Sequence, residues 1–317
     1  MWKRIALGLA ITAAVMWIYI KLAGVDLGAF CKVPLYAVVA SVALSALSDA
    51  VRAFRLKLLT KGVGEELSLK DSLLVWEASR LLAALTPGFY GGEVLRISTL
   101  SKKFGINKSI AVNVLETTSE AVAIGVNSFV AFAMLWLGGF KVNVAPLIFP
   151  VLMGVAQALG GSLVPALNCP KALKGKAREL CEGIREAISL AGYGTFGLAV
   201  LVSTVGVALY VMSFGVIASA LERAGTVGTL VFASALPLTA IPITPGGVGL
   251  PESACTLAYP KLAESLAVWR IINLTSTVLA STASLSLLGL LSSTPSLPRG
   301  LLGRGSRPSR RTVPSEP

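Results

Sequence analysis

The residues best suited to chemistry are charged side chains inside long apolar stretches. Glu116 and Glu120 lie four residues apart in one stretch and therefore share a helix face. Ionisable groups at membrane depth are costly and usually functional. The others are Glu77 with Arg80, Glu93 with Arg96, Glu252, and Arg270 with Asn273. The acids outnumber the bases, which predicts protonated carboxyls, a ligand with basic groups, or a co-transported proton or cation. The alternative is a set of internal salt bridges.

Two short apolar segments are interrupted by matching motifs. Thr86–Glu93 reads TPGFYGGE, and Thr244–Glu252 reads TPGGVGLPE. Glycines let a ligand approach the backbone, and a helix that restarts after a break presents free N–H groups to an anion. Ordinary loops followed by acids at helix starts are the plain alternative. The residues predicted to bind a ligand are Pro87, Gly88, Gly91, Gly92, Glu93, Arg96, Arg80, Glu116, Glu120, Pro245, Gly246, Gly247, Gly249, Glu252 and Arg270.

The composition requires a bilayer. Of the 317 residues, 54% are hydrophobic and 14% are charged, whereas soluble domains have about 25% charged residues. The chain has no histidine, which excludes a Ser-His-Asp triad and a histidine metal site. We expect no metal, no cofactor and no catalytic residue. The scattered cysteines are predicted to be packing residues: Cys31, Cys169, Cys181 and Cys255.

The apolar pattern predicts an all-α polytopic bundle with about six full spans. Each span is long enough to cross a hydrocarbon core of about 30 Å. Two further apolar stretches are too short for this and are predicted to be re-entrant hairpins, each interrupted by a Gly-rich break. They are Ser72–Thr86 continued by Val94–Leu100, and Leu230–Thr244 continued by Ser253–Ala258. The predicted spans are Ile5–Ala23, Pro34–Val51, Ile110–Leu137, Val144–Leu167, Thr195–Leu221 and Ser265–Leu291.

The basic residues predict an orientation. With both termini in the cytoplasm, twenty Lys and Arg residues face the cytoplasm and five face outside. The net charge of +12 therefore reflects membrane orientation rather than nucleic-acid binding. The 168–190 loop is expected to form a surface helix, and 293–317 a disordered basic tail. The cytoplasmic residues expected to gather anionic headgroups are Arg52, Arg55, Lys102 and Lys103.

The same arrangement predicts an inverted repeat. Residues 1–292 form one transmembrane domain, with halves at about 1–140 and 141–292. Each half contains two spans, a hairpin and a span, and the halves have opposite orientations. Paired Gly/Pro interruptions in two inverted halves are typical of the central site of a transporter.

At these residues the sequence resembles the lysylphosphatidylglycerol synthase transmembrane-domain, or flippase-like, family. The resemblance covers nearly all of residues 1–292. The family's commoner first motif has a basic residue where this chain has Phe89-Tyr90, so that headgroup contact is not expected here. The motifs are RAFRLKLL at Arg52–Leu59, TPG through Gly92-Glu93 with Arg96, Leu115-Glu116 with Glu120, PGGVG at Pro245–Gly249 with Glu252, and Arg270.

The resemblance implies movement of lipids across the cell membrane. The implied partners are anionic or aminoacylated phospholipids or polyprenyl-phosphate-linked precursors. Some members are fused to a soluble aminoacyl-transferase domain, which we do not expect after Thr294. Two alternatives remain: a membrane anchor for a separately encoded transferase, and an intramembrane enzyme that uses the glutamates as general acid and base.

Overall fold

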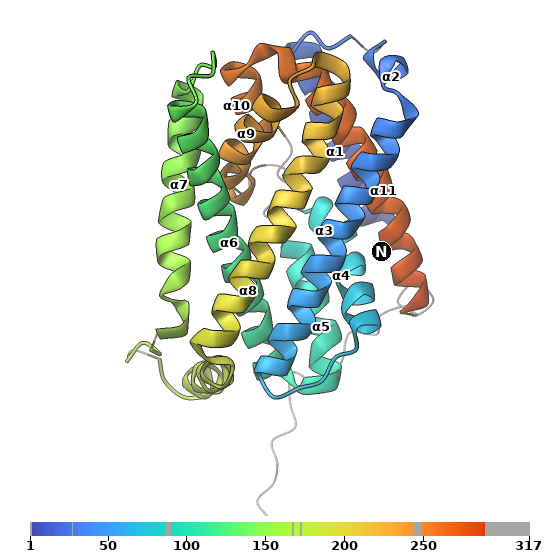
Figure 1. The fold of residues 1–317 in the computed structure, drawn as a ribbon. Helices are drawn as coiled ribbons and strands as arrows, with labels where there is room; N and C mark the ends of the chain where they lie inside the picture. Colours follow the sequence, from blue (N-terminus) through green and yellow to red (C-terminus); the bar gives the residue numbers. More distant parts are fainter. Residues whose placement is uncertain are drawn as a thin grey trace, which may run out of the picture.

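The computed structural model describes residues 2–26, 28–86, 90–166, 168–171, 173–241, 243 and 249–288 (Figure 1). All regular elements in these ranges are helices, which confirms the predicted all-α class. In chain order they are α1 (Trp2–Leu22), α2 (Ala29–Lys32), α3 (Leu35–Gly62), α4 (Leu69–Ala84), α5 (Tyr90–Phe104), α6 (Ile106–Leu137), α7 (Ala145–Ser162), η1 (Val164–Ala166), α8 (Lys176–Glu222), α9 (Gly225–Ala235), η2 (Leu236–Ala240), α10 (Leu250–Ala258), η3 (Pro260–Leu262) and α11 (Ala263–Leu287).

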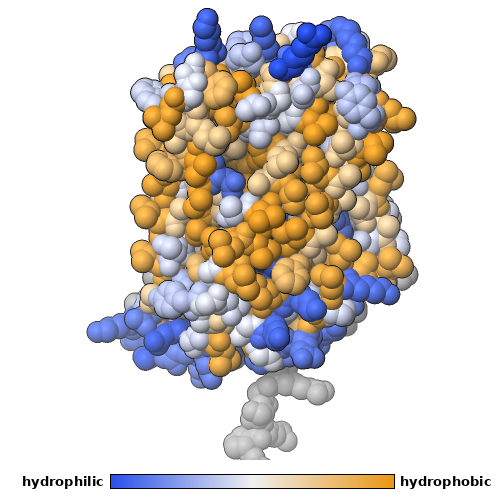
Figure 2. All heavy atoms as spheres, in the orientation of Figure 1, coloured by the Kyte–Doolittle hydropathy of each residue, from blue (hydrophilic) through white to orange (hydrophobic). Residues whose placement is uncertain are grey.

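The bundle has the surface of a multi-pass membrane protein. Figure 2 shows a hydrophobic band across the middle of one face, with hydrophilic residues at both ends. Outward-facing Phe129, Leu152 and Leu201 are each more than half exposed, as expected where lipid solvates the protein. In the described ranges, five helical segments are long and apolar enough to span: Leu35–Gly62, Ile106–Leu137, Ala145–Ala166, Lys176–Glu222 and Pro260–Leu287.

The first and second predicted spans differ in how well they match the structure. Helix α1 has 21 residues, about 31 Å at the usual rise, in agreement with the first predicted span. The second span was predicted to end at Val51, but α3 continues to Gly62 because no helix-breaking residue intervenes. Gly64, with φ of +77°, lies in the turn that follows. This extension moves the basic end of the predicted span into the bundle.

The two interrupted segments form short helices at opposite ends of the bundle. In Figure 1, α4 and α5 lie in the lower half, and α9 and α10 lie in the upper half. Helix α4 has 16 residues and α9 has 11, too few for a full crossing. Pro87, Gly88, Pro245, Gly246 and Gly247 lie outside the described residues, so their predicted ligand contacts are not tested here.

Small polar side chains connect neighbouring helices. Ser41 and Ser48 of α3 donate to the carbonyls of Ser213 and Gly206 of α8, at 2.8 and 2.7 Å. Ser128 of α6 donates in the same way to a carbonyl of α9, at 2.9 Å. Small residues and interhelical hydrogen bonds replace the hydrophobic effect as the source of helix association in lipid. They bring the backbones close around the centre of the bundle.

The start of α8 forms a separate helical arm. Gly192 has φ of 65° and ψ of 171°, and this conformation kinks α8 between the arm and the span. The apolar face of the arm, including Ala187 and Ala191, packs on the bundle core. The prediction of a helix within 168–190 therefore agrees with the structure, although its contact with a lipid leaflet is not tested. The predicted tail, 293–317, lies outside the described residues.

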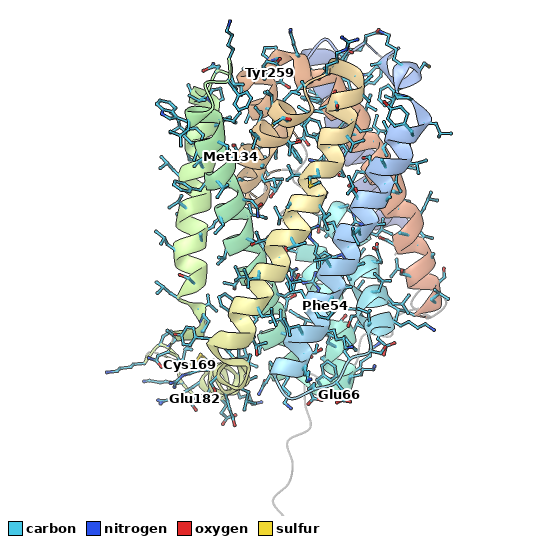
Figure 3. All side chains as sticks on the ribbon, in the orientation of Figure 1. Phe54, Glu66, Met134, Cys169, Glu182 and Tyr259 are labelled. Atoms are coloured by element: carbon cyan, nitrogen blue, oxygen red, sulfur yellow. A yellow bond between two sulfur atoms is a disulfide. The ribbon has the colours of Figure 1, made fainter. Side chains whose placement is uncertain are left out.

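The prediction that all four cysteines are packing residues is wrong. Cys169 and Cys181 form a disulfide with a Cα–Cα distance of 6.0 Å, at the end of the bundle where Figure 3 labels Cys169, Glu182 and Glu66. The link between α7 and α8 folds back on the helical arm and brings the two thiols together. Their spacing of 12 residues is not a recognisable pairing signal. Cys255, by contrast, is fully buried and unpaired, as predicted.

Candidate functional site

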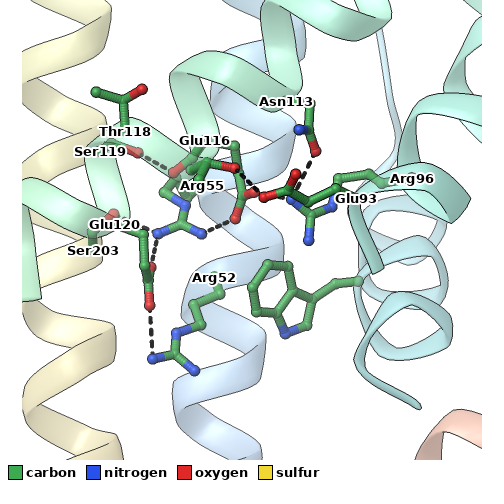
Figure 4. Close-up of polar contacts among 12 residues, drawn as sticks. Arg52, Arg55, Glu93, Arg96, Asn113, Glu116, Thr118, Ser119, Glu120 and Ser203 are labelled. Carbon is green, nitrogen blue, oxygen red and sulfur yellow. Dashed lines mark hydrogen bonds and ion pairs between the residues drawn. The ribbon is translucent and has the colours of Figure 1, made fainter. Parts of the chain in front are cut away.

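A chain of alternating charges joins three helices inside the bundle (Figure 4). Arg55 of α3 forms ion pairs with both Glu116 and Glu120 of α6. Arg96 of α5 pairs with the other oxygen of Glu116, and Arg52 pairs with the other oxygen of Glu120 at 2.9 Å. Three arginines therefore share two carboxylates, so the network carries a formal charge of +1.

Neutral groups complete this network. Ser203 Oγ lies 2.6 Å from Nη1 of Arg55, and Asn113 Oδ1 accepts from Arg96 at 3.3 Å. Trp76 of α4 lies among the guanidiniums. The Cζ atoms of Arg52, Arg55 and Arg96 are 5.9, 5.6 and 5.1 Å from the centre of its ring. Cation–π attraction to one indole offsets part of the excess positive charge.

Arg52 and Arg55 are not where the sequence predicted them. They were expected at the cytoplasmic surface as headgroup contacts, but Arg55 is fully buried and the side chain of Arg52 is 12% exposed. The cause is the longer α3, which carries both residues into the bundle. Lys102 and Lys103 are exposed at the end of α5, and Lys103 pairs with Asp71 at 3.0 Å. Of the four residues expected to contact headgroups at the surface, only Lys102 and Lys103 are exposed.

A second cluster lies between α3, α4 and α11. Arg80 pairs with Asp49 and approaches Glu77 to 3.5 Å, and its Nη2 donates to Thr277 at 2.8 Å. Asp49 also accepts a hydrogen bond from the Trp76 indole at 3.2 Å. The predicted Glu77–Arg80 pair is therefore present, but Asp49 is a stronger partner that sequence reasoning missed.

The second motif ends in a buried ion pair. One oxygen of Glu252 accepts from Nε of Arg270 at 2.7 Å, and the other accepts from the backbone N–H of Gly249 at 2.7 Å. Glu252 is fully buried, and Gly249 has φ of +104°, a conformation that side chains disfavour. Glu252 thus caps α10 and links it to α11.

These clusters surround a cavity of about 500 Å³. Its described lining comes from α3 to α8, η2 and α11, so segments from both predicted halves contribute. Tyr90, Gln157, Thr239 and Asn273 add polar groups to the wall. The charged side chains that line it are Arg52, Arg80, Arg96, Arg270, Glu93, Glu116 and Glu120.

Glu93 differs from the matched Glu252. Glu93 lines the cavity and accepts a hydrogen bond from Thr117 at 3.3 Å. Among the described residues it has no arginine or lysine partner, whereas both oxygens of Glu252 are occupied and Glu252 is not part of the described lining. The two glutamates therefore occupy similar places in the sequence but different environments.

Gly91 and Gly92 of the first motif serve packing. A Cβ on Gly92 would lie 2.7 Å from the Ser79 carbonyl oxygen and 2.8 Å from the Ala83 Cβ, and a Cβ on Gly91 would lie 2.8 Å from the Leu82 carbonyl oxygen. Both glycines therefore bring α5 against α4. Neither belongs to the described lining of the cavity, and their contact with a ligand stays a prediction.

The numbers of acids and arginines inside the bundle differ from those that the sequence suggested. Of the predicted set, Arg80, Arg96, Glu93, Glu116, Glu120 and Arg270 meet at the cavity. The extension of α3 adds Arg52 and Arg55 to the bases, and Asp49, which lies within the predicted span itself, adds an acid. Six carboxylates therefore face five arginines, a smaller excess than predicted. Among the described residues no group of His, Cys, Asp and Glu side chains could hold a metal ion.

Comparison with known proteins identifies the family. Residues 5–283 match the family described as lysylphosphatidylglycerol synthase TM region. A search of curated proteins finds no match. The family indicates a membrane protein of lipid metabolism or transport that associates with membrane phospholipids. Because the match covers most of the sequence, the chain belongs to the lysylphosphatidylglycerol synthase transmembrane-region family.

Proposed function

We propose that this protein moves phospholipids or lipid-linked precursors across the membrane in the manner of a flippase. The phosphate of the headgroup enters the central cavity, while the apolar tail remains in the bilayer. The observation that carries the proposal is the arginine-lined cavity inside an apolar bundle, with Arg52, Arg80, Arg96 and Arg270 in its wall. Guanidinium groups bind phosphate oxygens through paired N–H donors, which makes arginine the preferred residue for this task.

The acid partners of these arginines support reversible binding. Burying an unpaired arginine in a membrane protein is costly, and carboxylate partners offset that cost when the cavity is empty. Nε of Arg52 and of Arg96 is buried and has no hydrogen-bond partner among the described residues. A phosphate that enters the cavity would reach these donors only after the side chains turn, because neither Nε atom is accessible in this state. Because carboxylates compete for the same guanidiniums, binding remains weak enough for release.

The placement of the short helices supports a transport cycle. In our proposal α4 with α5, and α9 with η2 and α10, are re-entrant hairpins that enter the bilayer from opposite faces, as an inverted repeat requires. Residues of both hairpins line the same cavity: Arg96 on the first and Thr239 on the second. Alternating access then follows from rocking one half against the other.

A lipid-movement assay tests the proposal. We expect purified protein in vesicles to translocate fluorescent phosphatidylglycerol without changing the mass of the lipid. Arg270→Gln should slow this movement at least about tenfold, because hydrogen bonds to charged groups contribute about 1.5–3 kcal/mol each. Arg178→Gln is the matched control, since Arg178 is exposed on the helical arm. A change in lipid mass would favour an intramembrane enzyme, and no movement by the parent protein would favour a transferase anchor.

The side of the membrane from which single cysteines can be labelled tests the proposed re-entrant hairpins. In a cysteine-free background, Glu66→Cys and Lys103→Cys flank the first hairpin, and Arg223→Cys and Lys261→Cys flank the second. We expect an impermeant maleimide to label the first two from one side and the last two from the other. Labelling of Glu66→Cys and Lys103→Cys from opposite sides would show that α4 and α5 cross the membrane, and would overturn the proposed topology.

The same experiment decides the absolute orientation. The excess of basic residues favours a cytoplasmic position for the end that carries Glu66. The Cys169–Cys181 disulfide lies at that end and favours an oxidising compartment. Labelling Glu66→Cys in intact cells distinguishes these two orientations. Protection from the reagent supports a cytoplasmic position for this end, as the basic residues suggest, and reaction supports the oxidising side, as the disulfide suggests.

A further inference from the structure

The cluster of Asp49, Glu77 and Arg80 contains one carboxylate too many. Asp49 is 3% exposed and Glu77 is 8% exposed, so both acids are almost fully removed from solvent. Both approach the guanidinium of Arg80, which is the single base of the cluster. If both acids were ionised, the cluster would carry a net charge of −1 inside the bundle.

The two acids are bound very differently. Both oxygens of Asp49 have strong donors: the Trp76 indole N–H at 3.2 Å for one, and Arg80 for the other. Oε2 of Glu77 is buried and receives no hydrogen bond from any described residue, and its distance to Arg80 is 3.5 Å. A buried carboxylate that lacks donors strongly favours its neutral form. The excess charge therefore resides on Glu77.

In the part of the chain that the structure describes, each arginine on the helices around this cluster already has an acid partner. On the α11 side, the groups near Arg80 are Thr277 and Asn273, which are uncharged. On the α5 side, the nearest base of the network is Arg96, which is already paired with Glu116. The remaining helix packed against α4 is α3, which brings the second acid, Asp49. Helix α3 also carries Arg52 and Arg55, and both are already paired with glutamates of α6.

We propose that this cluster is a proton-binding site, with the proton on Glu77, and that proton binding is coupled to headgroup binding through Arg80. The proton converts the Glu77 carboxylate to a neutral carboxyl, and its release restores the carboxylate. The coupling half rests on the proposed transport function, whereas the proton site itself does not.

The geometry also gives the direction of coupling. Arg80 lines the cavity, so its guanidinium faces both the cluster and an entering phosphate. When Glu77 is ionised, two carboxylates attract Arg80 and oppose its contact with the phosphate. When Glu77 is protonated, Asp49 alone balances Arg80, and phosphate binds more tightly. By linkage, headgroup binding takes up a proton, and the lipid and the proton move together.

Infrared spectroscopy tests the proton site directly. We expect the purified protein near neutral pH to show the carbonyl-stretch band of a protonated carboxyl. Glu77→Gln should remove this band because it removes the carboxyl. Asp49→Asn should also remove it, because Glu77 then balances Arg80 and ionises. The control Glu179→Gln, at an exposed position of the helical arm, should retain the band. Persistence of the band in both cluster variants would overturn the proton site.

Lipid binding tests the coupling. We expect the parent protein in detergent to bind short-chain phosphatidylglycerol more tightly as the pH falls from alkaline values towards neutral, where Glu77 takes up its proton, by at most about tenfold per pH unit for one coupled proton. Glu77→Gln should bind at least as tightly as the parent at low pH, and its affinity should not change with pH. A pH-independent affinity in the parent would overturn the coupling. If the parent bound no lipid at all, the proposed function would fail, and the infrared result would still decide the proton site.

Discussion

Replacing Glu116 with glutamine is expected to lower the free energy of unfolding by about 3–5 kcal/mol, the usual effect of removing one partner from a buried charge network. Glu116 is 3% exposed and joins Arg55 to Arg96, so its loss leaves three arginines with Glu120 as their one ionised partner in the network. Detergent-induced unfolding monitored by circular dichroism measures the change. No other single acid of the network contacts guanidiniums from both α3 and α5.

Two further variants separate charge balance from general damage to the bundle. Glu179→Gln changes an exposed glutamate, and we expect a change within about 0.5 kcal/mol. The double variant Glu116→Gln with Arg96→Gln removes one uncompensated charge and should regain about 1 kcal/mol or more relative to Glu116→Gln alone. Equal stability of Glu116→Gln and the parent would mean that the network does not hold α5 and α6 together.

The helices were predictable because membrane spans have a simple signature. Apolar runs of sufficient length predicted α6 to within a few residues of its start and at its observed end, Leu137. The length of helix α3 was harder to predict, because its second half carries charged residues, as loops outside the membrane do. Arg52 and Arg55 are tolerated within the bundle because Glu116 and Glu120 pair with them, although these acids follow Arg55 by 61 and 65 residues in the sequence. Apolar length alone cannot reveal such long-range compensation.

The site was only partly predictable for the same reason. Glu116 and Glu120 were found from their helical spacing, and the structure confirms that they share a face because both contact Arg55. Asp49 and Trp76 were missed. An acid in a predicted span is itself a signal, so Asp49 could have been found by the criterion applied to the glutamates. The role of Trp76 depends on three guanidiniums from two other helices, which no local pattern shows.

The matched motifs also show what sequence likeness conceals. Each carries a glutamate at the start of the helix after the break, and the sequence alone suggests equal roles for Glu93 and Glu252. In the structure α5 is linked to α6 through Arg96 and Glu116, and α10 is linked to α11 through Glu252 and Arg270. In the first pair the base lies on the helix after the break and the acid on the next helix. In the second pair the acid comes first and the base second. Arg96 and Arg270 both line the cavity, and each is paired with an acid, Arg96 with Glu116 and Arg270 with Glu252.

This reversal leads to a second prediction with a large expected effect on stability and lipid movement. Arg270→Glu places two carboxylates together at a buried position and should cost about 3–5 kcal/mol of stability and abolish lipid movement. The charge-swapped double variant Glu252→Arg with Arg270→Glu restores an ion pair between α10 and α11 and should recover most of the stability. A deficit of about 1 kcal/mol should remain, because the exchange also removes the acceptor for the Gly249 N–H.

Lipid movement should not recover with stability in the swapped variant. Position 252 is fully buried and is not part of the described cavity lining, so an arginine there cannot replace the one lost from position 270. The two readouts, unfolding in detergent and translocation of fluorescent phosphatidylglycerol in vesicles, should therefore separate. If the swap restored both, Arg270 would act only as a clamp between α10 and α11, and the phosphate contact would have to come from the other cavity arginines. Failure of both would indicate that the swapped pair does not form. Arg270→Gln, which leaves one buried acid rather than two, would then measure the phosphate contact on a less damaged bundle.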